Sequence, residues 1–305
     1  MKVLSKEDKM FWDENGYVVI NKAVPPENIK ATVGAIWDFL EMEPNSPESW
    51  YPHPPRPGIG VKLYHHQTVW ENRQYPRVYQ AFSEIWGTEK LWVSFDQVSM
   101  SPPDRTTSGL SDKLYMEDSS KQPIPMHWDI PLERPLPFAV QGALYLTDTT
   151  EEMGAFTCVP GFHHKTEAWL KNLSPNVNPR KENLMSFGVK PIPGKAGDLI
   201  IWQGTLPHGA GQNIAHHPRL VQYISMFPEK VDDEDTRNYR INAWRNRLVG
   251  GGAWGVMHEL PFGKKVELRE EKEHALGQTA VLSSLGRKLL GLDRWERCLE
   301  SKCEL

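Results

Sequence analysis

His127 and Asp129 are the residues of this 305-residue chain whose types and spacing most directly suggest chemistry. In an extended segment from Met126 to Ile130, side chains alternate between two faces, so the histidine and the carboxylate would point the same way. With a second histidine from elsewhere, they would form the 2-His-1-carboxylate set that leaves open positions on iron(II). The motif alone is weak, because a histidine and an aspartate held by local hydrogen bonds would give the same pattern.

His208 is the candidate for the second histidine, and Arg219 follows it by eleven residues. His208 comes after an expected strand that ends at Gly204, and Arg219 begins the next one. The two would be adjacent if these strands pair as a hairpin. The planar fork of arginine can bind the far carboxylate of a small dicarboxylate. The alternative, a solvated His208 and a strand-end Arg219, explains each residue alone but explains their combination poorly.

Short strands separated by glycine and proline turns must position these side chains. Helices gather before and after the strands rather than between them, which favours an antiparallel double-sheet jelly roll over a parallel α/β fold. We expect strands at residues 17–20, 91–100, 139–147, 154–159, 187–193, 198–204 and 219–227. We expect helices at residues 5–15, 25–40, 76–86, 166–173, 232–248 and 268–292.

One domain over residues 1–305 is the expected organisation. Its jelly-roll core would cover about 91–228, with N-terminal helices in 1–90 and a C-terminal helical extension in 229–305. The polar segment 101–125 leads into the candidate metal-binding strand and is either a lid or a surface loop. It is a candidate wall of a substrate pocket, as are the proline-rich loop 44–60 and Trp244 or Trp254.

Composition excludes several classes of function. The chain has 35 basic and 39 acidic residues without a basic stripe, so we expect no nucleic-acid partner. Apolar runs are too short to span a bilayer, and the N-terminus has no secretory pattern, which predicts a cytoplasmic protein without a membrane partner. The cysteines Cys158, Cys298 and Cys303 lack paired spacing, so neither a disulfide framework nor a thiolate metal site is expected.

Four segments in a fixed order resemble the phytanoyl-CoA dioxygenase family of iron(II)/2-oxoglutarate oxygenases. They are HWD, GAFTCVPGFHHK, GDLIIWQGTLPHGAGQN and HPRLVQYISMF, and the resemblance covers roughly residues 11–228. It implies a double-stranded β-helix of the cupin-like jelly-roll type. It also implies iron(II) as cofactor and 2-oxoglutarate and dioxygen as cosubstrates. By this resemblance, iron is held by His127, Asp129 and His208, and 2-oxoglutarate by Arg219, with further contacts from Tyr145, Gln97 and Thr157.

The sequence departs from the family pattern at two positions. Phe162 stands where the family often has serine, and Ala210 where a hydroxyl residue is common two positions after the distal histidine. The second departure removes one possible hydrogen bond to the cosubstrate and leaves the arginine. Related halogenases replace the carboxylate ligand by a small residue, so the presence of Asp129 disfavours halogenation.

The predicted function is therefore oxidation, most simply hydroxylation, of a small organic molecule, with secondary metabolism as the suggested setting. Desaturation, epoxidation and rearrangement use the same oxidant, and neither the substrate nor the oligomeric state follows from the sequence. Two other classes remain open: a non-catalytic jelly-roll binding protein, and a zinc-dependent cupin-type enzyme. The binding protein should not consume 2-oxoglutarate, and the zinc-dependent enzyme has no need of Arg219.

Overall fold

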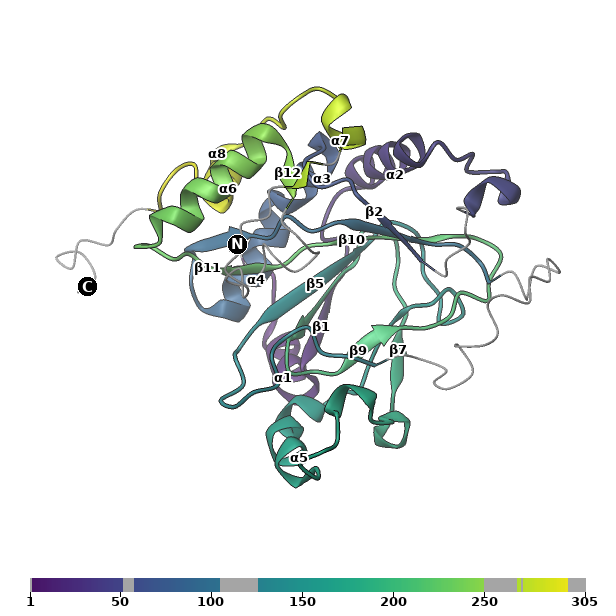
Figure 1. The fold of residues 1–305 in the computed structure, drawn as a ribbon, viewed down its shortest axis with the longest axis vertical. Coiled ribbons are helices and arrows are strands. Elements are labelled where there is room, and N and C mark those ends of the chain that lie inside the picture. Colours follow the sequence, from purple (N-terminus) through teal and green to yellow (C-terminus); the bar gives the residue numbers. More distant parts are fainter. Residues whose placement is uncertain (1, 52–57, 105–125, 250–267, 270, 296–305) are drawn as a thin grey trace.

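The computed structural model describes residues 2–51, 58–104, 126–249, 268–269 and 271–295, and combines helices with antiparallel sheets (Figure 1). Most of the expected lid (105–125) and Trp254 lie outside these ranges. None of the described helices is both long and apolar enough to cross a membrane. The α-helices are α1 (Lys6–Asn15), α2 (Pro26–Leu40), α3 (Gln67–Arg73), α4 (Pro76–Trp86), α5 (Thr166–Asn172), α6 (Glu234–Asn246), α7 (Glu271–Ala275) and α8 (Ser284–Leu290).

The largest sheet has six antiparallel strands, and a three-stranded sheet accompanies it. In spatial order the large sheet consists of β1 (Tyr17–Ile20), β8 (Leu199–Gln203), β5 (Val140–Tyr145), β10 (Arg219–Tyr223), β4 (Val98–Ser101) and β2 (Ile59–Val61). The smaller sheet consists of β7 (Lys190–Ile192), β6 (Phe156–Cys158) and β9 (His208–Ala210). Two further pairs join β3 (Leu91–Val93) to β11 (Met226–Pro228), and β12 (Leu248–Val249) to β13 (Leu268–Arg269).

Strand alternation divides the buried side chains of the large sheet between two cores. Along β8, Leu199 and Ile201 join the core that contains helical residues, whereas Ile200 and Trp202 join the core shared with the smaller sheet. Successive side chains of a strand point to opposite faces, so each central strand needs apolar residues on both. The helix-side core takes its helical members mainly from α2, α3 and α4, and includes Ile36, Trp70, Val78 and Phe82.

Local signals position the first helix and strand where the sequence predicts them. The side chain of Ser5 accepts a hydrogen bond from the Asp8 backbone N–H, and the Asp8 carboxylate accepts one from the Ser5 N–H. This capping box satisfies two donors that a helix start leaves open. Gly16 ends α1 at φ 77°, in the left-handed region, and β1 follows directly.

Several expected elements are broken in the structure. The strand predicted at 91–100 is two strands, β3 and β4, and the strand predicted at 219–227 is likewise β10 and β11. Both breaks occur where the chain leaves the large sheet for the β3–β11 pair. There the Ser94 N–H donates to the Ser225 carbonyl, and the Ser225 N–H donates to the Ser94 hydroxyl oxygen. The prediction of one helix at 268–292 is also wrong. The described part of this range contains the two-residue strand β13 and the short helices α7 and α8.

The hairpin that would make His208 and Arg219 neighbours does not form. β5 lies between β8 and β10 in the large sheet, and β9 pairs with β6 in the smaller one. His208 and Arg219 therefore reach a common site from different sheets. The sequence order of the strands does not reveal this arrangement, because their pairing is non-local.

Candidate metal centre and cosubstrate cavity

The segment that carries His127 and Asp129 is held in place without being a regular strand. Only His127 makes a ladder contact, an isolated bridge in which its N–H donates to the His208 carbonyl at 2.8 Å and the His208 N–H donates back at 3.0 Å. Between the two ligand candidates, Trp128 is 2% exposed and donates its indole N–H to the Thr205 carbonyl at 2.9 Å. The expected strand is thus reduced to one bridge, yet Trp128 points into the core as the alternation predicts.

His208 is buried and its ring orientation is fixed. Its Nδ1 lies 3.0 Å from the Leu206 carbonyl oxygen, so a proton on Nδ1 can be donated there. That tautomer leaves the Nε2 lone pair free to bind a metal. Phe156 stacks on the ring at a centroid distance of 6.0 Å, and Trp202 packs against it at 5.0 Å.

The three candidate ligands converge on one point, with all donor atoms within 4.8 Å of one another. Nε2 of His208 lies 2.8 Å from Oδ2 of Asp129, and Nε2 of His127 lies 3.5 Å from Oδ1. Donor atoms that share a metal at about 2.1 Å from each are spaced by about 3–4 Å. In the metal-free protein, Nε2 of His208 can share a proton with Oδ2 of Asp129, and a metal that takes the place of this proton would be bound by both atoms. The donor set therefore fits a divalent metal.

Asp129 is held in its ionised form. Burial raises the pKa of this carboxyl group, but the hydrogen bond to His208, the charges of both histidines and the hydrogen bond from Gln141 outweigh it, so the pKa lies below its usual value. Nε2 of Gln141 donates to Oδ2 of Asp129 at 3.0 Å. A metal ligand must be deprotonated, so these contacts prepare the carboxylate for coordination.

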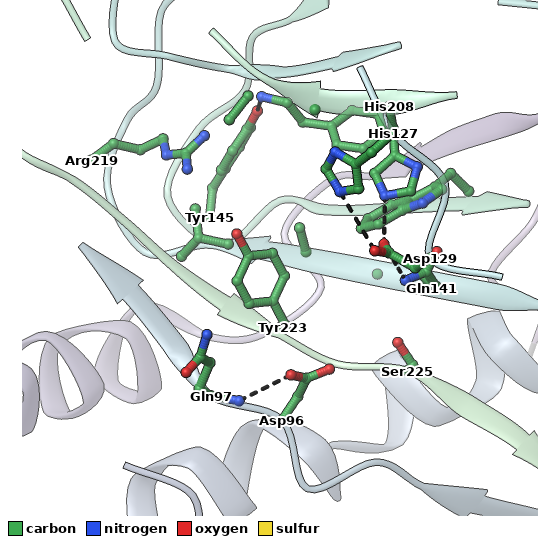
Figure 2. A pocket seen from close by; sticks show the side chains of 17 residues that line it. Asp96, Gln97, His127, Asp129, Gln141, Tyr145, His208, Arg219, Tyr223 and Ser225 are labelled. Atoms are coloured by element: carbon green, nitrogen blue, oxygen red, sulfur yellow. Dashed lines mark hydrogen bonds and ion pairs between the residues drawn. The ribbon is translucent and has the colours of Figure 1, made fainter. Parts of the chain in front are cut away.

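A cavity of about 230 Å³ opens beside these ligands, and Arg219 lies in its wall (Figure 2). Arg219 is 4% exposed and donates hydrogen bonds to the Gly154 carbonyl and, at 3.4 Å, to the Ser101 hydroxyl. None of the described residues forms an ion pair with it, and its Nε has no partner among them. A buried cation without a counter-ion is costly unless an anion compensates it.

The other predicted cosubstrate contacts have different positions. Tyr145 and Gln97 line the cavity, but Thr157 does not. The Tyr145 hydroxyl donates its one proton to the Ile192 carbonyl at 2.8 Å and accepts from the Phe156 N–H at 2.9 Å. Thr157 is fully buried and donates to the Ala155 carbonyl, because β6 turns Phe156 rather than Thr157 toward the cavity. The structure therefore gives Thr157 no direct contact with a ligand of this cavity.

Trp244, a predicted pocket wall, also lies away from the cavity. Its indole N–H donates to the Ala280 carbonyl at 3.2 Å, and its ring packs on the helix-side core. Of the two positions that depart from the family pattern, Ala210 lines the cavity and Phe162 packs against Trp128 and Trp169. The larger side chain at Phe162 therefore belongs to the core beneath the ligand segment.

Sequence reasoning missed several polar side chains of the cavity. Asp96, Gln141, Tyr223 and Ser225 line it, and Figure 2 shows Asp96 and Gln97 near Tyr223. Strand alternation could have identified Tyr223, because it shares a face with Arg219 four residues before it. The same alternation along the predicted 219–227 strand also places Ser225 on this face. Asp96 carries no such signal, since it lies where the predicted 91–100 strand is broken.

Comparison with known proteins supplies the wider context for this site. The family model described as phytanoyl-CoA dioxygenase matches residues 12–221. A Dictyostelium discoideum protein named for the phytanoyl-CoA dioxygenases is 24% identical over 277 residues, covering 76% of this chain and 78% of the relative. The Aspergillus versicolor protein "Ava biosynthesis cluster protein O" is 24% identical over 261 residues, covering 73% of this chain and 79% of the relative.

A solved structure shares the fold at low sequence identity. The epimerase SnoN, crystallised with Fe3+, alpha-ketoglutarate and nogalamycin RO, superimposes with a TM-score of 0.51 at 17% identity. The match covers 73% of this chain and 83% of SnoN.

Proposed function

Because the chain belongs to the phytanoyl-CoA dioxygenase family, we propose that it hydroxylates a small organic molecule with iron(II), 2-oxoglutarate and dioxygen. Enzymes of this family depend on iron(II) as cofactor and on 2-oxoglutarate and dioxygen as cosubstrates. When bound, iron couples the oxidative decarboxylation of 2-oxoglutarate to succinate and carbon dioxide with oxidation of a substrate C–H bond.

The fold proposed for this function is a double-stranded β-helix formed by one domain. Side chains from both the six-stranded and the three-stranded sheet line the cavity, which supports a site between two facing sheets. Residues of the C-terminal segment, among them Ala243 and Leu289, share the helix-side core with N-terminal residues such as Val78. That shared core supports a single domain over the whole chain.

His127, Asp129 and His208 are the proposed iron ligands. The carbonyl of Leu206 orients the His208 ring, and the amide of Gln141 orients the Asp129 carboxylate. Such outer contacts fix the ligand atoms before the metal arrives and support its affinity. His127 differs from the other two because its side chain is 46% exposed, so it is the ligand nearest to solvent.

The proposal that the protein binds 2-oxoglutarate rests on Arg219. Its buried guanidinium has no acidic partner among the described residues, yet it lines the same cavity as a metal-binding triad. A dicarboxylate that binds the metal at one end can place its far carboxylate on this arginine. A zinc-dependent enzyme or a simple binding protein has no use for that pairing, which is why the oxygenase is the better explanation.

The substrate is proposed to be a small molecule of secondary metabolism. The name of the Aspergillus relative refers to a biosynthesis cluster, and SnoN was crystallised with nogalamycin RO. Hydroxylation is the simplest outcome for this family. Substrate placement decides between hydroxylation and other oxidations by the same cofactor.

The test is to add iron(II) and 2-oxoglutarate without oxygen and to record the visible spectrum. We expect a weak charge-transfer band that appears only when both are present and that is absent with zinc. On admission of oxygen, succinate should form, and an accepted substrate should increase its rate and gain one oxygen atom. A protein that binds zinc but shows neither the band nor succinate would be a cupin-type enzyme or a binding protein instead.

A further inference from the structure

Asp96 is a buried carboxylate in the cavity wall with almost no protein partner. It is 5% exposed, and its only hydrogen bond among the described residues comes from the Gln97 backbone N–H, at 3.1 Å. Arg73 lies nearby but donates to backbone carbonyls, those of Tyr64 and of Asp96 itself. The carboxylate oxygens thus face the cavity with free acceptor capacity, as Figure 2 shows for Asp96 below Tyr223.

Two hydroxyl groups and an amide complete the same part of the wall. Ser225 is 3% exposed, and neither its hydroxyl nor that of Tyr223 has a hydrogen-bond partner among the described residues. Gln97 also lines the cavity, where its Oε1 lies 3.5 Å from the Tyr64 hydroxyl. Hydroxyl groups that border a cavity without a protein partner are available to hydrogen-bond a polar ligand.

The cavity wall has one part with a positive side chain, Arg219, and another with a negative one, Asp96. Arg219 is the only lysine or arginine among the described residues that line it, and Asp96 is the only acidic residue there besides Asp129. If Arg219 and the metal hold 2-oxoglutarate, the remaining polar wall is the one that contains Asp96. That wall repels an anion and attracts a group that donates hydrogen bonds.

We propose that Asp96, together with Ser225 and Tyr223, forms the substrate-binding subsite and selects a molecule that presents an amine or a hydroxyl group. This inference rests on the proposed function and names the substrate class of the same cavity. Asp96 accepts a hydrogen bond from the substrate group, and the two hydroxyls bind its remaining donors or acceptors. A carboxylate or a phosphate-bearing thioester is disfavoured at this position.

The charge of Asp96 in the ligand-free protein depends on pH near neutrality. Burial raises the pKa of the Asp96 carboxyl group to about 7, the charge of Arg73 and the Gln97 N–H lower it, and the charge of Asp129 raises it. Asp96 and Asp129 line the same cavity, so a group bound to Asp96 shares that cavity with the proposed metal ligands. A bound ammonium group favours the charged carboxylate and compensates its burial.

Ring compounds that differ only in their polar group test the subsite. Cyclohexylamine, cyclohexanol and cyclohexanecarboxylate are titrated into the full-length zinc-loaded protein, with and without 2-oxoglutarate, and Kd is measured by ligand-observed NMR. We expect the amine and the alcohol to bind at least about tenfold more tightly than the carboxylate, the range of one charge-assisted hydrogen bond. Replacement of zinc by Mn2+ should broaden the ring protons, which would place the probes beside the metal.

Variants separate this subsite from a general effect of charge. Asp96→Asn keeps the acceptor for the Gln97 N–H and should abolish the preference for the amine, whereas Ser225→Ala should weaken cyclohexanol about threefold or more. Asp148→Asn removes an exposed carboxylate that does not line the cavity and should change nothing.

Three results would overturn the inference: equal or tighter binding of the carboxylate, an unchanged preference in Asp96→Asn, or no binding of any amine or alcohol near the metal. Loss of the iron–2-oxoglutarate band would instead contradict the proposed function. Because a free metal and Arg219 would themselves attract the carboxylate, the order of affinities is judged with 2-oxoglutarate bound. Without 2-oxoglutarate, the loss of amine affinity in Asp96→Asn would still decide on the subsite.

Discussion

The side chain of Gln141 donates a hydrogen bond to Oδ2 of Asp129 at 3.0 Å, although the two residues come from separate segments on either side of a proline-rich turn. Gln141 is 2% exposed and lies on β5, a central strand of the large sheet. A central strand therefore orients a proposed metal ligand that belongs to an irregular segment. This dependence leads to the first prediction.

Gln141→Leu should weaken metal binding about tenfold to a hundredfold, the effect expected when a contact that orients a metal ligand is lost. Leucine has similar volume, and the change also removes the unpaired Oε1 of Gln141, so the fold should persist. Calorimetric titration of the metal-free protein with zinc measures the effect. Unchanged affinity in a folded variant would show that Asp129 needs no such support.

Asp129→Ala should abolish turnover and stoichiometric metal binding while the protein remains folded, because the residue lies in the cavity wall and not in a hydrophobic core. Metal content by elemental analysis, together with circular dichroism, checks both parts. Asp148→Ala removes an exposed carboxylate and serves as the control. Full activity of Asp129→Ala would refute the assignment of the ligands.

Arg219→Lys should weaken 2-oxoglutarate binding about tenfold to a hundredfold, since lysine keeps the charge but loses one of two charge-assisted hydrogen bonds. Arg219→Ala should weaken it further. Iron binding should barely change in either variant, because no proposed metal ligand is altered. Cosubstrate titrations at fixed iron content measure the effect, and Arg77→Ala, at a half-buried arginine that does not line the cavity, is the control. If the alanine variant retained wild-type affinity, the anchor would lie elsewhere.

The stability of the metal-free protein should depend on pH through Asp96. Its pKa is about 7 in the folded protein, raised from 3.8, so the folded state binds its proton more tightly than the unfolded state does. This contribution is fully present below about pH 4 and is lost as pH rises through 7. The free energy of unfolding of wild type relative to Asp96→Asn should therefore fall between pH 4 and 7, by at most roughly 4 kcal/mol.

Urea unfolding of both proteins at pH 5, 6, 7 and 8, with a chelator present, measures that difference. Glu273 also has a raised pKa of about 7, but it is common to both proteins and cancels in the comparison. A difference that does not vary with pH would mean that Asp96 titrates normally in the folded protein.

The sequence by itself determined those features that depend on local chemistry. Ser5, Asp8 and Gly16 delimit α1 through hydrogen bonds within a few residues, so the helix lies where it was predicted. Alternation from Met126 to Ile130 predicted that His127 and Asp129 point the same way, and both line the cavity. The combination of motifs led to the family, which the match over residues 12–221 confirms.

Only the tertiary structure decided how the site is assembled. The bridge between His127 and His208 joins residues 81 positions apart, and Arg219 reaches the same cavity from another sheet. Strand pairing of this kind is non-local, and a sequence pattern specifies which face a side chain takes but not which strand becomes its neighbour. The role inferred for Asp96 likewise depends on a break between β3 and β4 that periodicity does not reveal.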